Sequence, residues 1–548
     1  MGKKKRSNTL LSEKKKPVAA PLPTPAPSWG LQLNDKQALL ITLLFATVSY
    51  VFSFFYTSFY QGEEGAQYMN ALGFWHAPES ILGNWPKTGW KIVYAPVVLL
   101  GKEGVLIANC LVSAFTGFFS YKIAGKVIEK KTALPMILLF SQTLWFLLSF
   151  KFYSETLTAL ILSIAIYFYY CNKYFLFSLF ISYVLLLRQE FIFIIPFFAV
   201  VLFKRKKWAA LFALGLFPLL YNCWGWYVTG DMWYSIHESQ RTAALYKASY
   251  PRQGFDHYFI MSGTIFNYII ITLVVAYLAQ VIFRQVKKVE YPLLVPGLGF
   301  ILLHCLFNLQ AVEILTSTGG NLRYLLVVSP LLAVLAAKAA DNFRLVSNKI
   351  VVLLFLLPLF FVVAGKMTFT HNWIAMDTES GDRNFLPLLF CGATILVILM
   401  LRSNRQLIFS LAALCLLSMV LTIKPKKLCC DENFEQQKIV NYIKETRLDN
   451  KPIYQSLALF NFFYGKNPWD FPNGNYGLSG DSSLDKAPKG AIVIWDSHYA
   501  TKYGKVEIDY FNKNQSGYKV LKEFRSADNY FMALVFEKLA EATTIKNK

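Results

Sequence analysis

Charged residues are scarce in this chain. They make up 16% of its 548 residues, whereas hydrophobic residues make up 55%. A soluble globular protein carries about 25% charged residues, so this composition argues against one. The apolar residues also lie in blocks of about 17–25 residues, which is the pattern of membrane-spanning helices. The sequence therefore predicts a polytopic α-helical membrane protein.

Common catalytic and metal-binding motifs are absent as well. The eight cysteines show no paired C-x-x-C spacing, and no G-x-x-x-x-G-K-[ST], G-x-S-x-G or H-E-x-x-H motif occurs. No internal repeat of the kind found in many transporters is present. We therefore expect no cofactor and no metal ligand set, while dependence on a divalent metal stays open.

Acidic residues are fewer than basic ones. The chain contains 33 Asp and Glu residues and 55 Lys and Arg residues, so its formal net charge is +22. The basic residues cluster in short loops between apolar blocks, which is the positive-inside pattern and requires no nucleic-acid partner. Residues 1–36 are basic and rich in Pro and Ala, and prolines separate their charges from a first apolar block of full span length. This segment predicts a disordered cytoplasmic tail rather than a cleaved signal peptide.

The apolar blocks predict about 13 spans within a membrane domain over 37–427. They cover residues 37–56, 104–123, 132–149, 155–171, 174–187, 190–203, 207–228, 264–283, 292–309, 321–340, 349–366, 385–401 and 406–423. Residues 174–203 could form one long span, but two short helices meeting at Arg188 to Glu190 keep the basic residues 204–207 inside. We prefer the two short helices.

An odd number of spans places residues 428–548 on the outer face, opposite the cytoplasmic N-terminus. This segment combines a helix-like stretch, 436–446, with strand-like runs at 491–495 and 530–536. It predicts a small soluble α/β domain. The most suitable location is the inner (plasma) membrane of a bacterium, with this domain in the periplasm.

Ionisable residues gather at the predicted outer ends of the spans. They are Glu63, Glu64, Glu103, Glu155, Arg188, Glu190, Asp231, Glu238, Arg241, Arg252, Glu313 and Arg323. Charges beside hydrocarbon are costly, so a one-sided cluster indicates a functional site. The alternative is that many of them are ordinary loop charges.

The outer loop over 57–103 begins with an acidic pair, Glu63 and Glu64. Behind the pair, Met69, Leu72 and Trp75 recur at three-residue spacing, which predicts an amphipathic helix lying on the membrane. Two carboxylates at a bilayer surface suit general-base catalysis on a hydroxyl group. The alternative is a helix N-terminus, where acidic residues interact favourably with the helix dipole.

These features resemble the GT-C glycosyltransferases, which use lipid-linked sugars and include protein O-mannosyltransferases and the aminoarabinose transferases of lipid A. Glu63 and Glu64 match the acidic pair of the family, although Asp is frequent at the first position. The stretch from Asn84 to Lys87 resembles a Pro/Lys loop motif, and Gly320 to Tyr324 resembles a late Arg-Tyr element. The resemblance covers about residues 37–423.

The resemblance implies an inverting transfer of a sugar from a polyprenyl-phosphate donor to a hydroxyl acceptor, which could belong to a lipid, a glycan or a protein. Either Glu63 or Glu64 would be the general base, with Glu63 slightly favoured. Arginine binds phosphate through a planar fork, so Arg323 and Arg188 are the candidates for the donor phosphate. Their alternative role is snorkelling to lipid headgroups. The other candidate substrate-binding residues are Lys87, Tyr324, Glu155 and Glu190.

Two other classes of protein stay open. A transporter or flippase of lipid-linked sugars would also have many spans, but transporters tend to carry ionisable residues near the middle of the membrane. The one-sided charges of this chain favour an enzyme at the interface. A noncatalytic scaffold for envelope assembly is the other alternative.

Overall fold

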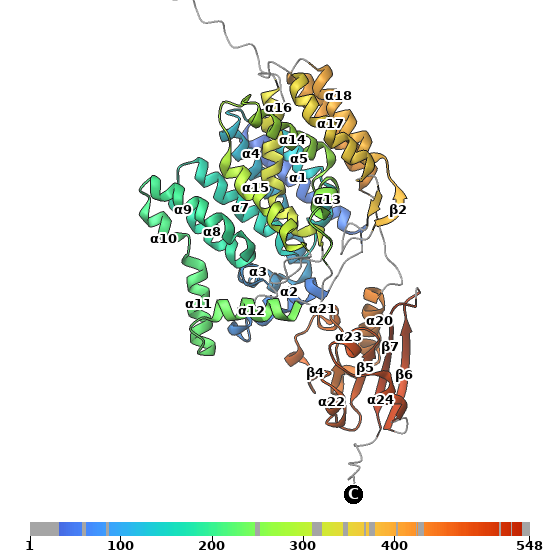
Figure 1. Cartoon of the computed structure of the whole chain (residues 1–548). Coiled ribbons are helices and arrows are strands. Elements are labelled where there is room, and N and C mark those ends of the chain that lie inside the picture. The colour runs from blue at the N-terminus through green and yellow to red at the C-terminus, as the bar shows by residue number, and fades with distance from the viewer. Residues whose placement is uncertain are drawn as a thin grey trace, which may run out of the picture.

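The computed structural model consists of a large helical body and a small domain that contains a β-sheet (Figure 1). The described residues are 32–56, 62–83, 87–246, 252–309, 320–343, 349–366, 369–371, 379–401, 404–423, 425, 432–513, 517–527 and 529–539. Most of the predicted tail over 1–36 therefore lies outside the described residues.

The helical body runs from α1 to α19. Its first part contains α1 (Asp35–Ser53), α2 (Gly62–Gly73), η1 (Pro78–Ile81), α3 (Thr88–Tyr94), η2 (Val97–Leu100), α4 (Gly101–Val127), α5 (Leu134–Phe140), α6 (Thr143–Leu148), α7 (Ser154–Tyr170), α8 (Tyr174–Leu187), η3 (Gln189–Ile194), α9 (Ile195–Lys204), α10 (Trp208–Ala213), α11 (Leu216–Thr229) and α12 (Tyr234–Tyr246). Its second part contains α13 (His257–Phe266), α14 (Tyr268–Ile282), α15 (Tyr291–Phe307), η4 (Leu322–Val328), α16 (Ser329–Asn342), α17 (Lys349–Gly365), β1 (Phe369–His371), β2 (Glu379–Arg383), α18 (Leu386–Met400) and α19 (Asn404–Thr422).

Four helical stretches among the described residues are long and apolar enough to cross a membrane. They are Asp35–Ser53, Val97–Val127, Leu322–Asn342 and Arg405–Thr422, and the bent pair of α13 and α14 would make a fifth. The described residues also contain further apolar helices of 10–17 residues. The chain is therefore a helical membrane protein with several apolar helices, and the number of about 13 spans stays a prediction.

Several predicted blocks are interrupted, which corrects their description as single spans. The block 132–149 is divided between α5 and α6, and the block 207–228 between α10 and α11. The block 321–340 begins as the 3-10 helix η4 but continues directly into α16, and together they form the single apolar stretch Leu322–Asn342. The block 264–283 is bent by 117° at Asn267. Asn267 adopts a left-handed backbone (φ 71°), and its side chain accepts a hydrogen bond from the Ile269 amide, which caps the new helix.

The preferred break between the two short helices of 174–203 is confirmed. Helix α8 ends at Leu187, and Arg188 adopts an extended backbone (φ −146°, ψ 99°) before η3 begins. The Arg188 amide still donates to the Val184 carbonyl (2.7 Å), but its extended backbone turns the following residues out of the i→i−4 pattern, so the helix ends there. The Arg188 side chain is thereby placed at a helix end, where it can reach residues of other helices.

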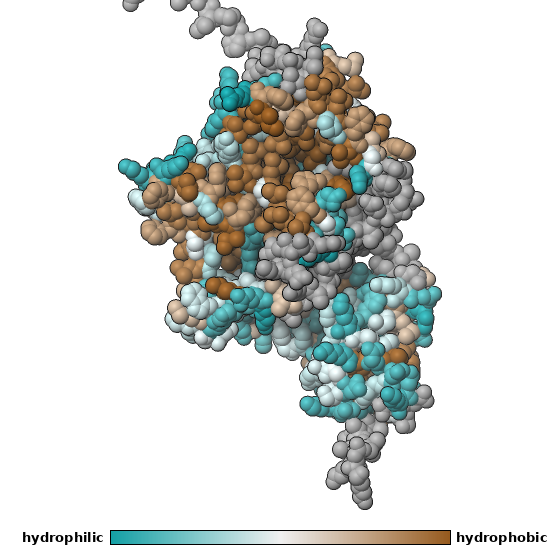
Figure 2. All heavy atoms as spheres, in the orientation of Figure 1, coloured by the Kyte–Doolittle hydropathy of each residue, from teal (hydrophilic) through white to brown (hydrophobic). Residues whose placement is uncertain are grey.

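The core of the helical body is centred on α16. All but two of its residues are buried, and alanines allow the neighbouring helices to approach closely. Figure 2 shows hydrophobic side chains over much of the helical body, whereas the small domain is mostly hydrophilic. This contrast fits a body surrounded by lipid and a domain surrounded by water.

The small domain contains a five-stranded sheet in the order β4-β3-β5-β7-β6. Its elements are α20 (Glu432–Glu445), η5 (Leu448–Asn450), β3 (Ile453–Gln455), α21 (Phe460–Tyr464), η6 (Pro468–Asp470), β4 (Asn475–Gly477), α22 (Asp481–Asp485), β5 (Ile492–Asp496), α23 (Tyr499–Lys502), α24 (Ile508–Lys513), β6 (Tyr518–Arg525) and β7 (Met532–Lys538). Strand β3 pairs in parallel with β4 and β5, while β7 pairs antiparallel with β5 and β6. The predicted helix and both predicted strands correspond to α20, β5 and β7, whereas β3, β4 and β6 were not predicted.

Candidate functional site

The acidic pair lies in the first turn of α2. Successive helical residues point about 100° apart, and the two carboxylates accordingly have different partners. The Glu63 carboxylate forms an ion pair with Arg323, and one of its oxygens accepts a hydrogen bond from Gln67 (3.2 Å). The Glu64 carboxylate is fully buried and accepts a hydrogen bond from the Phe152 amide (2.9 Å). Glu63 therefore faces the charged cluster, while Glu64 holds α2 against the segment before α7.

The helix predicted behind the pair is present, and two of the three residues of its apolar stripe pack against the protein. Met69 and Leu72 are half-buried and pack against a protein core that includes Tyr68 and Trp90. Trp75 lies beyond the end of α2 and donates a hydrogen bond from its indole to the Ala95 carbonyl (2.6 Å). Met69 and Leu72 therefore contact the protein, whereas Trp75 remains 53% exposed.

Two arginines and three carboxylates form one charged cluster. The Arg323 guanidinium, on η4, pairs with Glu63 and lies 3.8 Å from Glu155. The same Glu155 oxygen lies 2.5 Å from Nη2 of Arg188, whose Nη1 lies 3.6 Å from Glu190. Glu155 thus bridges the two arginines. The predicted candidates on α2, α7, η3 and η4 meet at one place although they are up to 260 residues apart.

Aromatic rings form the walls of this cluster. The Arg323 guanidinium lies 4.0 Å from the ring centroid of Tyr153, and the Arg188 guanidinium lies 4.5 Å from that of Tyr324. Such cation–π contacts hold a guanidinium in a fixed plane. Tyr324 was predicted as a site residue, whereas Tyr153 was not.

Much of the hydrogen-bonding capacity of the cluster is unused. Among the described residues, Nε and Nη1 of Arg323 and Nε of Arg188 are buried and donate no hydrogen bond. One carboxylate oxygen each of Glu155 and Glu190 is likewise buried without a donor. Buried polar atoms are normally satisfied, so such a group of them suggests that a polar ligand or water completes the site.

The pKa values of Glu63 and Lys87 are both lowered, Glu63 by the neighbouring cations and Lys87 by burial. Burial alone would raise the pKa of Glu63, but the charge and hydrogen bond of Arg323, with Arg188 and Lys87, hold it below its usual range. Lys87 is the residue before α3, and burial lowers its pKa although Glu190 opposes the shift. Its predicted neighbours Asn84 to Pro86 lie outside the described residues.

Of the eight predicted site residues, six are in mutual contact, and a seventh, Lys87, interacts with them electrostatically. Glu64 lies on the other side of α2. Sequence reasoning missed Tyr153, the Phe152 amide and His304, a buried residue whose ring lies 6.4 Å from that of Tyr324. A polar stretch, Lys151 to Glu155, between two apolar blocks was the available signal for the first two.

Other ionisable residues of the predicted outer edge have partners of their own. Glu103 accepts a hydrogen bond from Tyr50, and Glu238 pairs with Arg241 at 2.6 Å. Asp231 lies 2.7 Å from His237, and Arg252 donates to two backbone carbonyls, while Glu313 lies outside the described residues. For the described residues of this group, the alternative interpretation as ordinary structural charges fits better.

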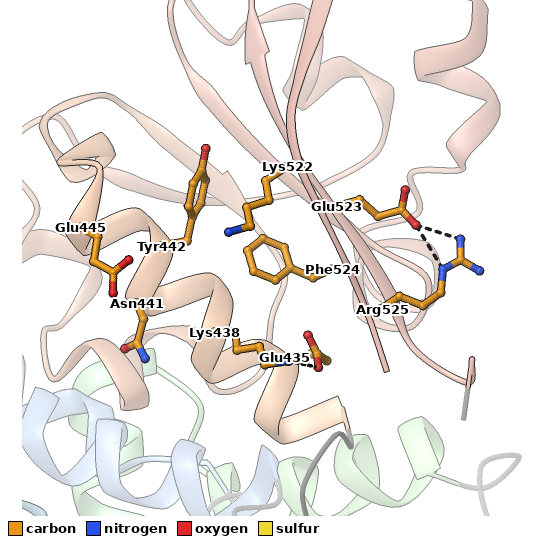
Figure 3. A pocket seen from close by; sticks show the side chains of 9 residues that line it. All are labelled: Glu435, Lys438, Asn441, Tyr442, Glu445, Lys522, Glu523, Phe524 and Arg525. Atoms are coloured by element: carbon orange, nitrogen blue, oxygen red, sulfur yellow. Dashed lines mark hydrogen bonds and ion pairs between the residues drawn. The ribbon is translucent and has the colours of Figure 1, made fainter. Parts of the chain in front are cut away.

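A separate cavity of about 520 Å³ lies in the small domain between α20 and β6 (Figure 3). Its lining combines the rings of Tyr442 and Phe524 with three basic and three acidic side chains, of which Lys438 pairs with Glu435 and Arg525 with Glu523. It shares no residue with the charged cluster. Within the described ranges, no group of three His, Cys, Asp or Glu side chains could hold a metal ion.

Comparison with known proteins gives a likeness in structure only. No protein-family model and no curated protein sequence matches this chain. The crystal structure of ArnT from Cupriavidus metallidurans bound to undecaprenyl phosphate matches with a TM-score of 0.54 at 11% identity, over 91% of this chain and 98% of that chain. The apo structure of the same ArnT matches with a TM-score of 0.52 at 12% identity and the same coverage. Helical body and small domain together therefore share the fold of this ArnT, which agrees with the fold that the resemblance in sequence implied.

Proposed function

We propose that this protein is a membrane glycosyltransferase that moves a sugar from a polyprenyl-phosphate donor to a hydroxyl acceptor at the outer membrane face, with inversion. The observation that carries the proposal is the buried cluster around Arg323, in which two arginines with unused N–H groups lie beside the acidic pair. The bound undecaprenyl phosphate of the similarly folded ArnT supports a ligand of this class. The acceptor is a lipid, a glycan or a protein.

The arginines would bind the donor phosphate. Each guanidinium is held against a tyrosine ring, which leaves its edge available for phosphate oxygens. Arg323 would exchange its ion pair with Glu63 for the phosphate, and Lys87 would add positive charge. As the sugar leaves, negative charge builds up on the phosphate, and these cations stabilise it.

Glu63 would act as the general base. It takes the proton of the acceptor hydroxyl while the hydroxyl oxygen forms a bond to the anomeric carbon. The bond between that carbon and the phosphate oxygen breaks, and its electron pair leaves with polyprenyl phosphate. Attack from the face opposite the leaving group inverts the anomeric centre. Glu63 is more accessible than Glu64, with 18% of its side chain exposed against complete burial.

The loop charges support a cytoplasmic N-terminus and an external small domain over about 428–548. The inner membrane of a bacterium fits both this orientation and the donor class. Lipids of that membrane would surround the helical body, and we propose no nucleic-acid partner and no cofactor.

One structural feature favours a second candidate function, a flippase for lipid-linked sugars. Helices α13 and α14 form a broken pair at Asn267, and broken helices are frequent in transporters. A flippase would move donor lipid between leaflets without consuming it. A noncatalytic scaffold would neither move the donor lipid between leaflets nor transfer its sugar.

A transfer assay on the purified protein in nanodiscs distinguishes these functions. Mass spectrometry of the lipids that co-purify identifies the polyprenyl-linked sugar, which is then offered with candidate acceptors. We expect release of polyprenyl phosphate together with a glycosylated acceptor, and loss of both in Glu63→Gln. Unchanged transfer in both Glu63→Gln and Glu64→Gln would overturn the assignment of the base. Movement of donor between leaflets without any transfer would support the flippase.

A further inference from the structure

We propose that the small C-terminal domain positions the acidic pair, because its helix α21 and the preceding Leu459 dock against a glycine face of α2. This inference rests on the proposed function, since it concerns the geometry of the proposed base. It gives the domain a role in the transfer reaction without any contact with the substrate. Figure 1 shows α21 next to α2, at the end of the helical body that faces the small domain.

The docking surface on α2 exists because two residues lack side chains. Gly62 and Gly65 flank the acidic pair and lie three positions apart, so they share one helix face. A Cβ atom on Gly65 would lie 2.6 Å from Cδ2 of Leu459 and 3.4 Å from Cβ of Phe462, and one on Gly62 would lie 3.1 Å from Cβ of Ala458. A side chain at Gly65 would therefore push the domain and the first turn of α2 apart.

Phe462 of the small domain contacts both segments that the hydrogen bond of Glu64 joins, which are α2 and the segment at Phe152. Its ring packs edge-on against Tyr68 of α2 (5.5 Å between centroids) and against Phe152 (6.0 Å). The Phe152 amide is the donor to Glu64. Phe462 and Leu459 are almost completely buried, so this contact is a closed apolar interface rather than a surface encounter.

A second contact holds the other end of α2. The ring of His76 stacks on Trp469 of the small domain (4.5 Å, 16° between planes). A Cβ atom on Gly73, the last residue of α2, would lie 3.2 Å from the same indole. The domain thus touches α2 near both ends, which restricts its tilt as well as its rotation.

The docking segment is itself anchored within the domain. The Leu459 amide donates a hydrogen bond to Gln436 on α20 (3.0 Å), and the Lys444 ammonium donates to the carbonyl of Tyr464 (3.1 Å). Because α21 is held to α20 at both of its ends, the domain can act as a rigid support. The first turn of α2 then has one orientation, with Glu63 directed to Arg323.

A double-mutant cycle on Gly65 and Leu459 tests the proposal. Gly65→Ala should lower kcat by about 10-fold or more, because small displacements of a catalytic group are costly. The KM for donor should change little, since both arginines are untouched. The acidic limb of the pH–rate profile should move to higher pH as Glu63 separates from Arg323. Adding Leu459→Ala removes the clashing methyl groups and should restore much of the lost rate.

The controls separate positioning from stability. Gly477→Ala adds a methyl group in β4 where no atom lies within 4 Å, and Leu457→Ala removes a buried side chain from the domain's own core. Hydrogen exchange of residues 62–73 reports the order of α2 independently of activity. We expect faster exchange there in Gly65→Ala and wild-type exchange in both controls.

The cycle also has outcomes that overturn the proposal. Wild-type kcat and exchange in Gly65→Ala would do so, and so would the absence of coupling between the two substitutions, measured against Leu459→Ala alone. A failure of the proposed function looks different, because then Glu63→Gln and Glu64→Gln would both keep normal transfer rates. Loss of transfer in the Glu variants with a normal Gly65→Ala would refute only the positioning role.

Discussion

Replacing Arg323 by Gln should weaken donor binding and also change the behaviour of Glu63. Arg323 pairs with Glu63, lies 3.8 Å from Glu155, and has two donor groups without a hydrogen bond among the described residues. Glutamine keeps part of the volume and removes the charge. The loss of one charge-assisted phosphate contact costs about 1.5–3 kcal/mol, which corresponds to about a 10- to 150-fold rise in the Kd for polyprenyl phosphate.

The same substitution should move the pH profile in a defined direction. Burial tends to raise the pKa of Glu63, and Arg323 is the largest of the influences that lower it. Without Arg323 the pKa rises, so the base becomes protonated at a higher pH. The acidic limb of kcat/KM should therefore shift to higher pH, and activity below neutrality should fall more than activity above it.

The assay is a titration of nanodisc-embedded protein with undecaprenyl phosphate, followed by a pH–rate profile of the residual transfer activity. Arg525→Gln is a matched control, because Arg525 is half-exposed on β6 and pairs only with Glu523 among charged groups that the structure describes. Circular dichroism checks that both variants are folded. Unchanged affinity and an unshifted acidic limb in Arg323→Gln would remove Arg323 from the donor site.

Three further predictions concern the base, the aromatic wall and the orientation. Glu63→Gln should slow transfer by about 10²–10⁴-fold with little effect on donor binding, and Glu64→Gln should cost much less; equal losses would refute the separate roles. Tyr153→Ala should raise the donor Kd by about 2- to 30-fold through loss of a cation–π contact, whereas Tyr153→Phe should behave as wild type in a binding titration. A reporter fused at Lys548 should be external, and a cytoplasmic signal would contradict the odd number of spans.

Local sequence features determined a good part of the candidate site. The acidic pair and the spacing behind it predicted a helix in the first outer loop, with a helix start at Glu63 and Glu64 as the alternative interpretation of the pair, and α2 does begin there. The break at Arg188 followed from the charges of its loops. Charged groups next to apolar segments are costly unless they pair, so the meeting of Arg188 and Arg323 with glutamates could be expected once all of them were predicted on one side of the membrane.

The sequence could not show which groups would pair or which helices would be interrupted. Glu155 lies close to both arginines because its helix, α7, packs between η4, which carries Arg323, and the break after α8, where Arg188 lies. The bend at Asn267 depends on its own side chain capping α14, in a block whose hydropathy reads as continuous. Periodicity and hydropathy report on neighbours along the chain and not on partners brought in by folding.

Overall composition thus determined that the chain is a helical membrane protein, and the loop charges predicted that its ionisable residues gather at one membrane edge. Only the tertiary structure decided that Glu64 turns to the Phe152 amide, that Tyr153 lies against Arg323, and that Leu459 packs on Gly65. Each of these contacts joins segments that are distant in sequence. Their existence depends on shape complementarity between packed surfaces, and a one-dimensional pattern of residue types does not contain that information.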